Sequence, residues 1–231
     1  MSRLFVVATP IGNLGDITLR ALEVLRSVGH IAAEDTRHTA KLLRHYEIAT
    51  PLISYHEHNR RRQLPRILEL LDQGDVALVS DAGTPGISDP GAELVTAADA
   101  AGHDVVPLPG PSALSAILSV AGCEPGPVHF LGFLPRKRGA RRDLVERYAA
   151  FPGVTVFFET PHRLQAALTD IAAVAGAQQL VVGRELTKLH EEVVRGPAAV
   201  VAAQLALKPP RGEFVLVLQG TGEGPPTVSA V

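Results

Sequence analysis

An apolar run followed by a glycine- and proline-rich loop occupies residues 76–91, which read Val76-Ala77-Leu78-Val79-Ser80-Asp81-Ala82-Gly83-Thr84-Pro85-Gly86-Ile87-Ser88-Asp89-Pro90-Gly91. The short apolar run is typical of a strand that is buried on both faces of a parallel sheet. Strand-to-helix connections usually have roughly two to six residues. The longer loop here, with two aspartates and three glycines, therefore favours a ligand site beyond the carboxyl end of the strand over an ordinary connection.

Apolar runs of strand length alternate with segments of helical period on both sides of this stretch. Strands separated by helices run parallel with right-handed crossovers, so residues 1–110 are predicted to form an α/β lobe with a parallel sheet covered on both faces. The predicted strands are Leu4–Ala8, Ile31–Ala33, Leu52–Ser54, Val76–Val79 and Val105–Leu108, and the predicted helices are Leu19–Val28, Lys41–Tyr46, Leu64–Leu71 and Ala92–Ala101.

A proline-rich segment, Pro107 to Pro111, interrupts this pattern and predicts a hinge between lobes that also forms a rigid wall beside a site. Residues 111–220 are predicted to form a second α/β lobe with a mixed sheet, because its last strands are close enough in sequence to pair antiparallel. Its predicted strands are His129–Phe133, Thr155–Phe158, Leu180–Gly183, Val193–Arg195 and Phe214–Leu218, and its predicted helices are Ser115–Ala121, Arg142–Ala150, Leu164–Ala175 and Ala198–Leu207. Residues 221–231 are predicted to be a flexible tail.

The amino-acid composition limits the classes of protein to which the chain can belong. The chain has 231 residues, of which 46% are hydrophobic, enough for a core in each of two lobes. The formal net charge of −2 gives no indication that the chain as a whole binds a nucleic acid or a membrane. The single cysteine, Cys123, excludes an intrachain disulfide and a multi-cysteine zinc site, and favours a cytoplasmic setting. The amino-terminal apolar run is too short for a signal peptide or a membrane span.

Known nucleotide-binding signatures are missing, because neither a Gly-x-Gly-x-x-Gly nor a P-loop pattern occurs in the chain. Four loop clusters follow predicted strands of the first lobe instead: Thr9–Asp16, Glu34–Arg37, Ser80–Gly91 and Pro109–Ala113. Parallel strands place their carboxyl ends on one edge of the sheet, so these clusters are expected to line a single pocket. The sequence His56-Glu57-His58 offers two potential metal ligands on a strand but no third partner nearby, so no metal site is predicted.

The loop clusters resemble the tetrapyrrole methylase superfamily and, within it, the branch of small-subunit ribosomal RNA methyltransferases. The resemblance covers about residues 4–219. The motifs that carry it are Thr9-Pro10-Ile11-Gly12-Asn13-Leu14, Glu34-Asp35-Thr36-Arg37, His56-Glu57-His58-Asn59, the stretch 79–91, Pro109-Gly110-Pro111-Ser112-Ala113, Gly132-Phe133-Leu134-Pro135, Glu159-Thr160-Pro161-His162-Arg163 and Arg184-Glu185-Leu186-Thr187-Lys188 with Glu191.

The resemblance implies a two-lobe homodimeric enzyme that binds S-adenosylmethionine in the cleft between its lobes. It also implies methylation of a cytidine 2′-hydroxyl in 16S ribosomal RNA, as naked RNA or in the assembled small subunit. The residues implied to hold the cofactor are Pro10, Gly12, Asp81, Ala82, Gly83, Pro85, Gly86, Ser112 and Ala113.

A ribose hydroxyl is a poor nucleophile until its proton leaves, so methyl transfer calls for a base or for a cation that stabilises the developing alkoxide. Charged groups within the motifs make Asp35, Glu185, Lys188 and Glu191 the catalytic candidates. A structural salt bridge is an equally good explanation for each of them.

Two basic stretches are candidates for contact with RNA phosphates, because local clusters of Lys and Arg supply affinity without a basic chain. The alternative for each is a solvated helix face. The residues are Arg60, Arg61 and Arg62 in the first stretch, and Arg136, Lys137, Arg138, Arg141 and Arg142 in the second.

Two other functions fit the same sequence. A methyltransferase for a small tetrapyrrole-like acceptor would share the cofactor half of the site. A non-catalytic RNA-binding or ribosome-assembly protein would need only the basic surface.

Overall fold

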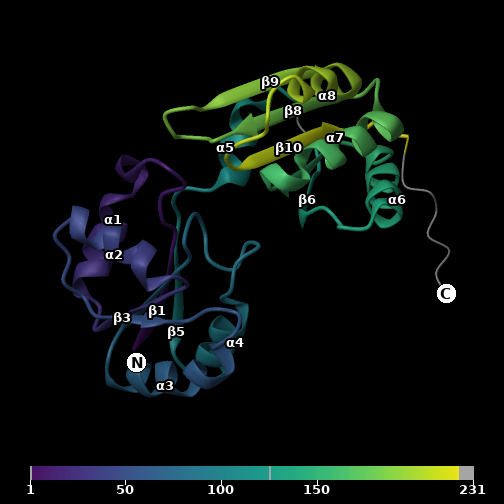
Figure 1. Ribbon diagram of the computed structural model, residues 1–231. Coiled ribbons are helices and arrows are strands. Elements are labelled where there is room, and N and C mark those ends of the chain that lie inside the picture. Colours follow the sequence, from purple (N-terminus) through teal and green to yellow (C-terminus); the bar gives the residue numbers. More distant parts are fainter. Residues whose placement is uncertain (1, 125, 224–231) are drawn as a thin grey trace, which may run out of the picture. The chain divides into compact units, whose positions relative to one another are not determined.

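The computed structural model describes residues 2–124 and 126–223, and the chain divides into two compact units between Ser112 and Ala113 (Figure 1). Each unit has its own sheet and its own apolar core. Residues 224–231 of the predicted flexible tail lie outside the described residues.

The first unit is a parallel α/β fold in the strand order β3-β2-β4-β1-β5. This arrangement confirms the predicted parallel sheet. Its elements are β1 (Arg3–Val7), the 3₁₀ turn η1 (Leu14–Asp16), α1 (Leu19–Ser27), β2 (His30–Ala33), α2 (Thr36–His45), β3 (Leu52–Ser54), α3 (Arg60–Gln73), β4 (Val76–Val79), α4 (Ala92–Ala100) and β5 (Asp104–Leu108).

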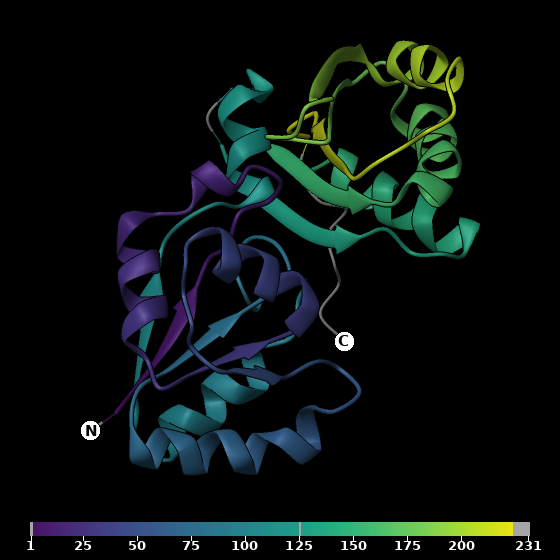
Figure 2. The same ribbon diagram turned by 60° about the vertical axis from the view of Figure 1, so that its left-hand side comes forward.

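Both faces of this sheet are covered, as alternate residues of its central strand show. Ala77 and Val79 of β4 pack with α1 and α2 in one core. Val76 and Leu78 pack with α3 and α4 in another. Figures 1 and 2 show the two helical layers on opposite sides of the strands. A continuous apolar run is therefore required at β4, as is typical of a central parallel strand.

The second unit contains a mixed sheet in the order β6-β7-β10-β8-β9. Strands β6 and β7 are parallel, and the other neighbours are antiparallel, which confirms the predicted pairing of the last strands. Its elements are α5 (Ala113–Ala121), β6 (Val128–Phe133), α6 (Arg138–Ala149), β7 (Val154–Glu159), α7 (Pro161–Ala175), β8 (Gln179–Arg184), β9 (Glu192–Pro197), α8 (Ala198–Ala206) and β10 (Phe214–Gln219).

One face of the second sheet packs against α6, α7 and α8 around Phe157, Leu168 and Leu216. Helix α5 lies against β8, where a Cβ on Gly183 would come within 2.7 Å of Ile117 Cδ1. Within the described part of the chain, no helix combines the length and apolarity that a membrane span requires.

Five predicted helices begin earlier than the sequence pattern indicated, and three of them do so by four or five residues. Helix α2 begins at Thr36 rather than at residue 41, α3 at Arg60 rather than 64, and α6 at Arg138 rather than 142. The first turns of all three are polar or basic, so they carry no apolar period to mark where the helix starts.

Candidate functional site

The loop clusters of the first unit meet at the carboxyl edge of its sheet. Thr9 and Gly83 exchange backbone hydrogen bonds, each N–H lying 2.9 Å from the other carbonyl oxygen. The Thr84 hydroxyl donates to the carbonyl of Pro111 at 3.5 Å. These contacts join three clusters that are far apart in the sequence.

The fourth cluster is tied to the others by the carboxylate of Asp81, whose Oδ1 accepts a hydrogen bond from the backbone N–H of Asp35 at 2.9 Å. The side chain of Asp35 takes no part in this hydrogen bond to Asp81. It caps α2 by accepting from Arg37 N at 2.8 Å, and it also forms an ion pair with the Arg37 guanidinium. These hydrogen bonds to Arg37 hold the pKa of Asp35 well below its usual range. A carboxylate in this state is a weak proton acceptor at neutral pH.

Two glycines shape the loop 80–91. Gly86 has φ +84°, and a Cβ placed on it would meet nothing within 4 Å, so its backbone faces open space. Gly91 has φ +155°, and a Cβ there would lie 3.3 Å from the amide nitrogen of Gly86. The loop thus folds back on itself and leaves an exposed stretch of main chain that a ligand can approach.

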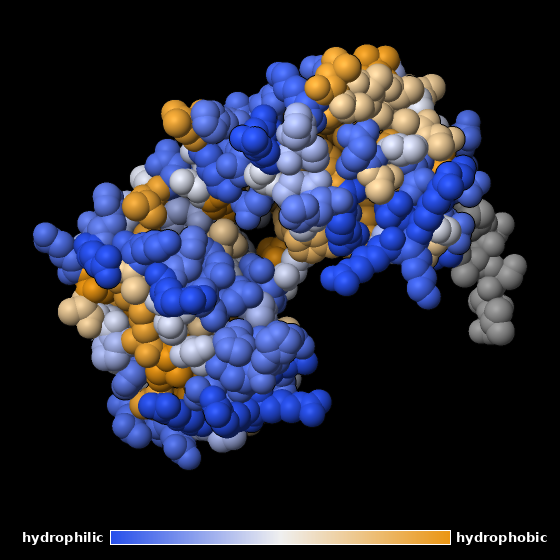
Figure 3. All heavy atoms as spheres, viewed as in Figure 1, coloured by the Kyte–Doolittle hydropathy of each residue, from blue (hydrophilic) through white to orange (hydrophobic). Residues whose placement is uncertain are grey.

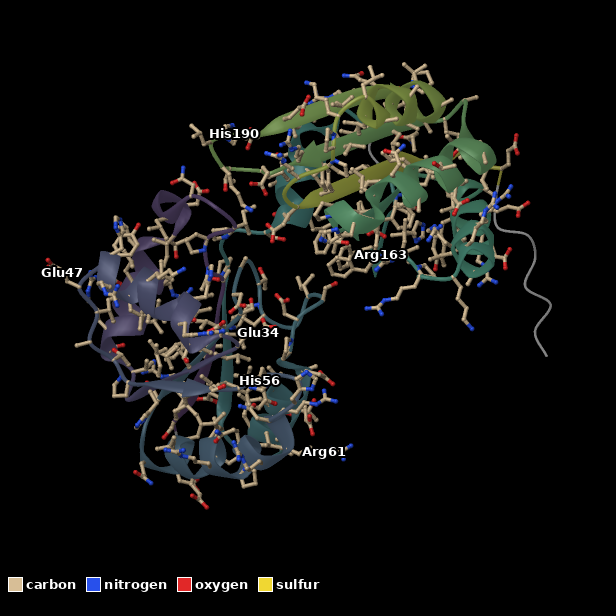
Figure 4. All side chains as sticks on the ribbon, viewed as in Figure 1. Glu34, Glu47, His56, Arg61, Arg163 and His190 are labelled. Carbon is tan, nitrogen blue, oxygen red and sulfur yellow. The ribbon has the colours of Figure 1, made fainter. Side chains whose placement is uncertain are left out.

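Carboxyl groups gather at the same edge. Burial, and then the nearby charges of Glu34 and Asp81, raise the pKa of Asp89 to about 6, although a hydrogen bond from Ser80 opposes the shift. Burial and the charge of Asp81 also raise the pKa of Glu34. Figure 4 shows Glu34 near His56, whose charge acts in the opposite direction on the pKa of Glu34. The edge therefore favours a ligand that brings positive charge or hydroxyl donors.

Sequence reasoning selected neither Glu34 nor Asp89 as a site residue. Glu34 directly follows β2 and Asp89 lies in the loop after β4, both within the quoted motifs, so the signal was available. The other residues predicted to hold a cofactor vary in exposure. Pro10, Gly83 and Pro85 are buried, Gly12, Ala82 and Gly86 are exposed, Asp81, Ser112 and Ala113 are half-buried, and Ala113 belongs to the second unit.

The catalytic candidates of the second unit form an ion-paired turn between β8 and β9. Lys188 Nζ lies 2.8 Å from Glu185 Oε1 and 2.8 Å from Glu213 Oε2. Burial disfavours the charged lysine, but the hydrogen bonds to the two carboxylates outweigh it and raise the pKa of Lys188. Glu191 accepts a hydrogen bond from Thr187 N. Lys188 is therefore a fixed cation and not a base at neutral pH.

Backbone conformation in this turn is unusual. Glu185 and Thr187 have φ values of +49° and +69°, in the left-handed region that non-glycine residues avoid. For a β-branched residue such as Thr187, this conformation costs about 1–3 kcal/mol and persists only when neighbouring contacts enforce it. The pairs around Lys188 and Glu191 supply those contacts.

The first basic stretch begins α3. Arg61 and Arg62 are exposed, and Figure 4 shows Arg61 extending from the helix. Arg60 is half-buried and forms ion pairs with Glu57 at 3.1 Å and Glu93 at 3.3 Å.

The second basic stretch leads into α6. Arg136, Lys137 and Arg138 are exposed and Arg142 is half-buried. Figure 3 shows strongly hydrophilic residues on the visible face of this unit around the start of α6. Arg141 differs from its neighbours, because its side chain is 8% exposed and paired with Asp170. The prediction that Arg141 contacts RNA is therefore wrong: its guanidinium lies inside the unit.

The histidine pair considered as metal ligands lies in a turn and not on a strand. The rings of His56 and His58 have their centres 6.0 Å apart. Within residues 2–124 and 126–223, no group of three or more His, Cys, Asp or Glu side chains is arranged to hold a metal ion.

The second unit contains a small hollow of about 110 Å³ between α8 and β10, lined in part by Leu164, Leu205, Pro209 and Phe214. Pockets that enclose a cofactor usually have about 300–1,000 Å³. This hollow is too small for such a ligand.

Comparison with known proteins places these features in a family. The family model described as "Tetrapyrrole (Corrin/Porphyrin) Methylases" matches residues 3–202. The chain is similar to proteins named "Ribosomal RNA small subunit methyltransferase I". It is 49% identical to the protein of Synechocystis sp., over 99% of this chain and 83% of that protein. It is 50% identical to that of Xylella fastidiosa, over 95% of this chain and 82% of that protein.

Two solved structures share the fold at low sequence identity. Uroporphyrin-III-C-methyltransferase from Thermus thermophilus superposes with a TM-score of 0.63 at 18% identity, and the match covers 96% of each chain. The cobalamin biosynthetic enzyme cobalt precorrin-4 methyltransferase superposes with a TM-score of 0.67 at 16% identity, again over 96% of each chain. The joined loops, the two-unit architecture and the relatives agree: the chain belongs to the tetrapyrrole methylase family and, within it, to the ribosomal RNA small subunit methyltransferase I group.

Proposed function

We propose that this protein transfers a methyl group from S-adenosylmethionine to the 2′-hydroxyl of a cytidine in 16S ribosomal RNA. The relatives named above are methyltransferases of the small-subunit RNA. The observation that carries the proposal is the meeting of four loop clusters around Asp81 at one sheet edge, in a chain whose basic side chains lie in two exposed stretches.

S-adenosylmethionine is the methyl donor of enzymes of this type, and the carboxyl edge of the first unit fits it. A sulfonium and an ammonium group are attracted by carboxylates, and Glu34, Asp81 and Asp89 provide them. The exposed main chain at Gly86 offers amide and carbonyl groups to a polar ligand. We assign the donor to this edge, with the loop 81–86, Pro10, Gly12, Ser112 and Ala113 as its holders.

When bound, the cofactor supplies an electrophilic methyl group. The remaining contribution of the protein is to hold the ribose oxygen in line with that group, since well-oriented reactants reach effective molarities of about 10⁵–10⁸ M. The fixed charge of Lys188 suits the stabilisation of a developing alkoxide, and Glu185 and Glu213 position its ammonium group. Glu191 holds the turn through Thr187 N. The carboxylate of Asp35 caps α2 and is not assigned the proton.

The decisive experiment maps ribose methylation in small-subunit RNA from cells with and without the gene. We expect one cytidine to lose its 2′-O-methyl group on deletion and to regain it when the gene is restored. An unchanged methylation map would overturn the proposal.

A methyltransferase for a small acceptor is separated from this function by neutralising the second basic stretch. Arg136→Ala, Lys137→Ala and Arg138→Ala together should abolish RNA methylation and leave the affinity for S-adenosylmethionine nearly unchanged, because none of these exposed cations is among the proposed holders of the cofactor. Full retained activity would favour a small acceptor. Calorimetry with S-adenosylmethionine tests the non-catalytic alternative, which predicts no binding.

A cytoplasmic location, which the single cysteine favours, and a homodimer, which the family resemblance implies, belong to the same proposal. Sedimentation of the purified protein tests the second: a mass of one chain at micromolar concentration would contradict it.

A further inference from the structure

The turn between β6 and α6 is held from inside the second unit. This turn, residues 134–137, carries the exposed side chains of Arg136 and Lys137, whereas Leu134 is buried in the core. Three successive carbonyl groups of the turn, those of Leu134, Pro135 and Arg136, accept hydrogen bonds from arginine side chains.

Arg141 supplies two of these bonds. Its Nη1 donates to the carbonyl oxygens of Pro135 and Arg136, each at 3.3 Å. The other side of the guanidinium contacts Asp170 on α7, with Nε 2.8 Å from Oδ2. The side chains of Arg141 and Asp170 are 8% and 3% exposed, so this pair is buried.

Arg163 supplies the third bond, from Nη2 to the carbonyl of Leu134. The same nitrogen lies 3.0 Å from Glu159 Oε1, and the Glu159 side chain is completely buried. Figure 4 shows Arg163 at the start of α7. This pair belongs to the motif Glu159-Thr160-Pro161-His162-Arg163, to which the proposed chemistry gives no role.

We call the four residues Arg141, Asp170, Arg163 and Glu159 the carbonyl clamp. The cations of this region are of two kinds: arginines paired inside the clamp, and exposed side chains on the turn that the clamp holds. Arg163 is paired with the buried Glu159, and Arg141 with the buried Asp170, whose other oxygen lies 3.3 Å from Nε of the exposed Arg138. Arg136 and Lys137, which the clamped backbone carries, have exposed side chains. Buried ion pairs contribute little net stability compared with apolar residues of similar size. Their directional hydrogen bonds, in contrast, fix the path of the backbone.

We propose that Arg141 and Arg163 are positioning residues for the RNA substrate: they hold the backbone of residues 134–136 so that the side chains of Arg136 and Lys137 meet its phosphates. The inference rests on the proposed function, and it assigns Arg141 and the half-buried Arg163 to substrate binding through the turn. A loose turn would present the same charge with more conformational entropy to lose on binding.

The test removes one clamp pair without changing net charge. Arg141→Met with Asp170→Leu replaces the pair by apolar side chains that a buried site tolerates. It also removes the partner of the exposed Arg138, whose freed charge would strengthen phosphate binding and so cannot mimic the expected loss. The matched control is Arg3→Met with Asp75→Leu, which removes an ion pair at the amino ends of β1 and β4 in the first unit. The substrate is small ribosomal subunits isolated from the deletion strain.

For the clamp variant we expect KM for the subunits to rise about tenfold, as for the loss of one to two phosphate contacts. The value of kcat and the Kd for S-adenosylmethionine should stay within about twofold of the wild type, as should all three parameters of the control. Arg163→Lys, which can still donate to Leu134 and pair with Glu159, should retain most of the wild-type KM.

An unchanged KM in the clamp variant would overturn the inference. So would a fall in kcat or in cofactor affinity equal to the rise in KM, because it would indicate a general structural role. If the double variant does not fold, Arg141→Lys takes its place, because lysine keeps the charge and nearly the volume of arginine but lacks the forked guanidinium group. An unchanged KM in Arg141→Lys would overturn the inference equally. Failure of the proposed function appears separately, as absence of subunit methylation by the wild-type protein.

Discussion

The carboxyl group of Asp89 makes the stability of the first unit depend on pH. Its pKa in the folded protein, about 6, lies above the ordinary value of 3.8. The fold therefore favours the protonated form, and Asp89 lowers stability as pH rises from about 4 to about 6. Asp89→Asn should remove this penalty and stabilise the protein above pH 6 by about 1–3 kcal/mol, with little effect at pH 4.

Urea unfolding of wild type and Asp89→Asn at pH 4, 5, 6 and 7.5 checks this prediction. The difference between the two free energies of unfolding should grow across this range and then level off. A difference that does not vary with pH would show that Asp89 titrates normally.

Lys188 gives a second prediction at the scale of one residue. Because its ammonium group is held by two carboxylates and remains charged, Lys188→Ala should lower kcat for subunit methylation about 100-fold, as for loss of one donor to a developing anion. Lys188→Arg keeps the charge and should retain more activity than Lys188→Ala. Measurement of kcat tests this prediction, with thermal unfolding as the control for folding. A loss of stability without a loss of kcat would contradict the proposed role of Lys188 in stabilising the alkoxide.

Single residues also show where sequence reasoning reaches its limit. Motif membership selected Asp35, but only the structure shows that Arg37 occupies its carboxylate. Local charge placed Arg141 with the RNA-binding residues. The sequence held a signal against that assignment, because Arg141 precedes Val145 and Ala149 by four and eight residues and so shares the buried face of α6. The partner that makes its burial possible, Asp170, is 29 residues away and carried no signal.

At the scale of elements, one residue at the start of α2 both caps the helix and contacts the candidate site. Asp35 caps this helix with its side chain, and its backbone N–H bonds to Asp81. Asp35→Ala should lower Tm by several degrees because the cap is lost, whereas Asp35→Asn should keep most of the stability, since an asparagine also caps helices.

Methyl-transfer assays on the same two variants separate a cap from a base. If Asp35 is a cap, Asp35→Asn keeps near-wild-type kcat. A drop of 100-fold or more in Asp35→Asn with unchanged Tm would restore Asp35 as a catalytic residue.

Every predicted strand and helix has a counterpart in the structure, and the differences concern where elements begin and, by one or two residues, where they end. Strands such as β4 were predictable to the residue, because an apolar run with turn residues on both sides defines both ends. Helix starts such as that of α6 were not, because Arg138 to Arg141 look like a solvated stretch. The irregular pairing of β6 with β7 between Phe130 and Phe133, where Gly132 adopts φ +61°, also lacks a local signal.

At the scale of the whole molecule, the two units should respond differently to the cofactor. The proposed holders of S-adenosylmethionine lie in the first unit, apart from Ala113. Hydrogen exchange with saturating cofactor should therefore slow most in residues 9–16 and 80–91 and little in β9 and α8. Ligand at 100 times Kd should add about 2.7 kcal/mol of stability. Equal protection of β9 and α8 would contradict this placement.

The meeting of the loop clusters in the first unit was predictable, because parallel topology alone brings the carboxyl ends of β1, β2, β4 and β5 to one edge. The carboxyl pair of Glu34 and Asp89 was not, because its effect on the pKa values depends on distances and burial that topology does not set. The strand order of the second sheet likewise depends on long-range pairing, of which only the antiparallel sense was foreseeable.

The position of β10 has a consequence for biosynthesis. This strand, residues 214–219, lies between β7 and β8, yet it follows both of them and β9 in the chain. While the ribosome is still translating, β7 and β8 each present an unpaired edge that only this late segment can cover. A message interrupted before codon 214 would yield a first unit with all its strands beside a second with two open edges, a product prone to aggregation and a natural target for chaperones and proteases.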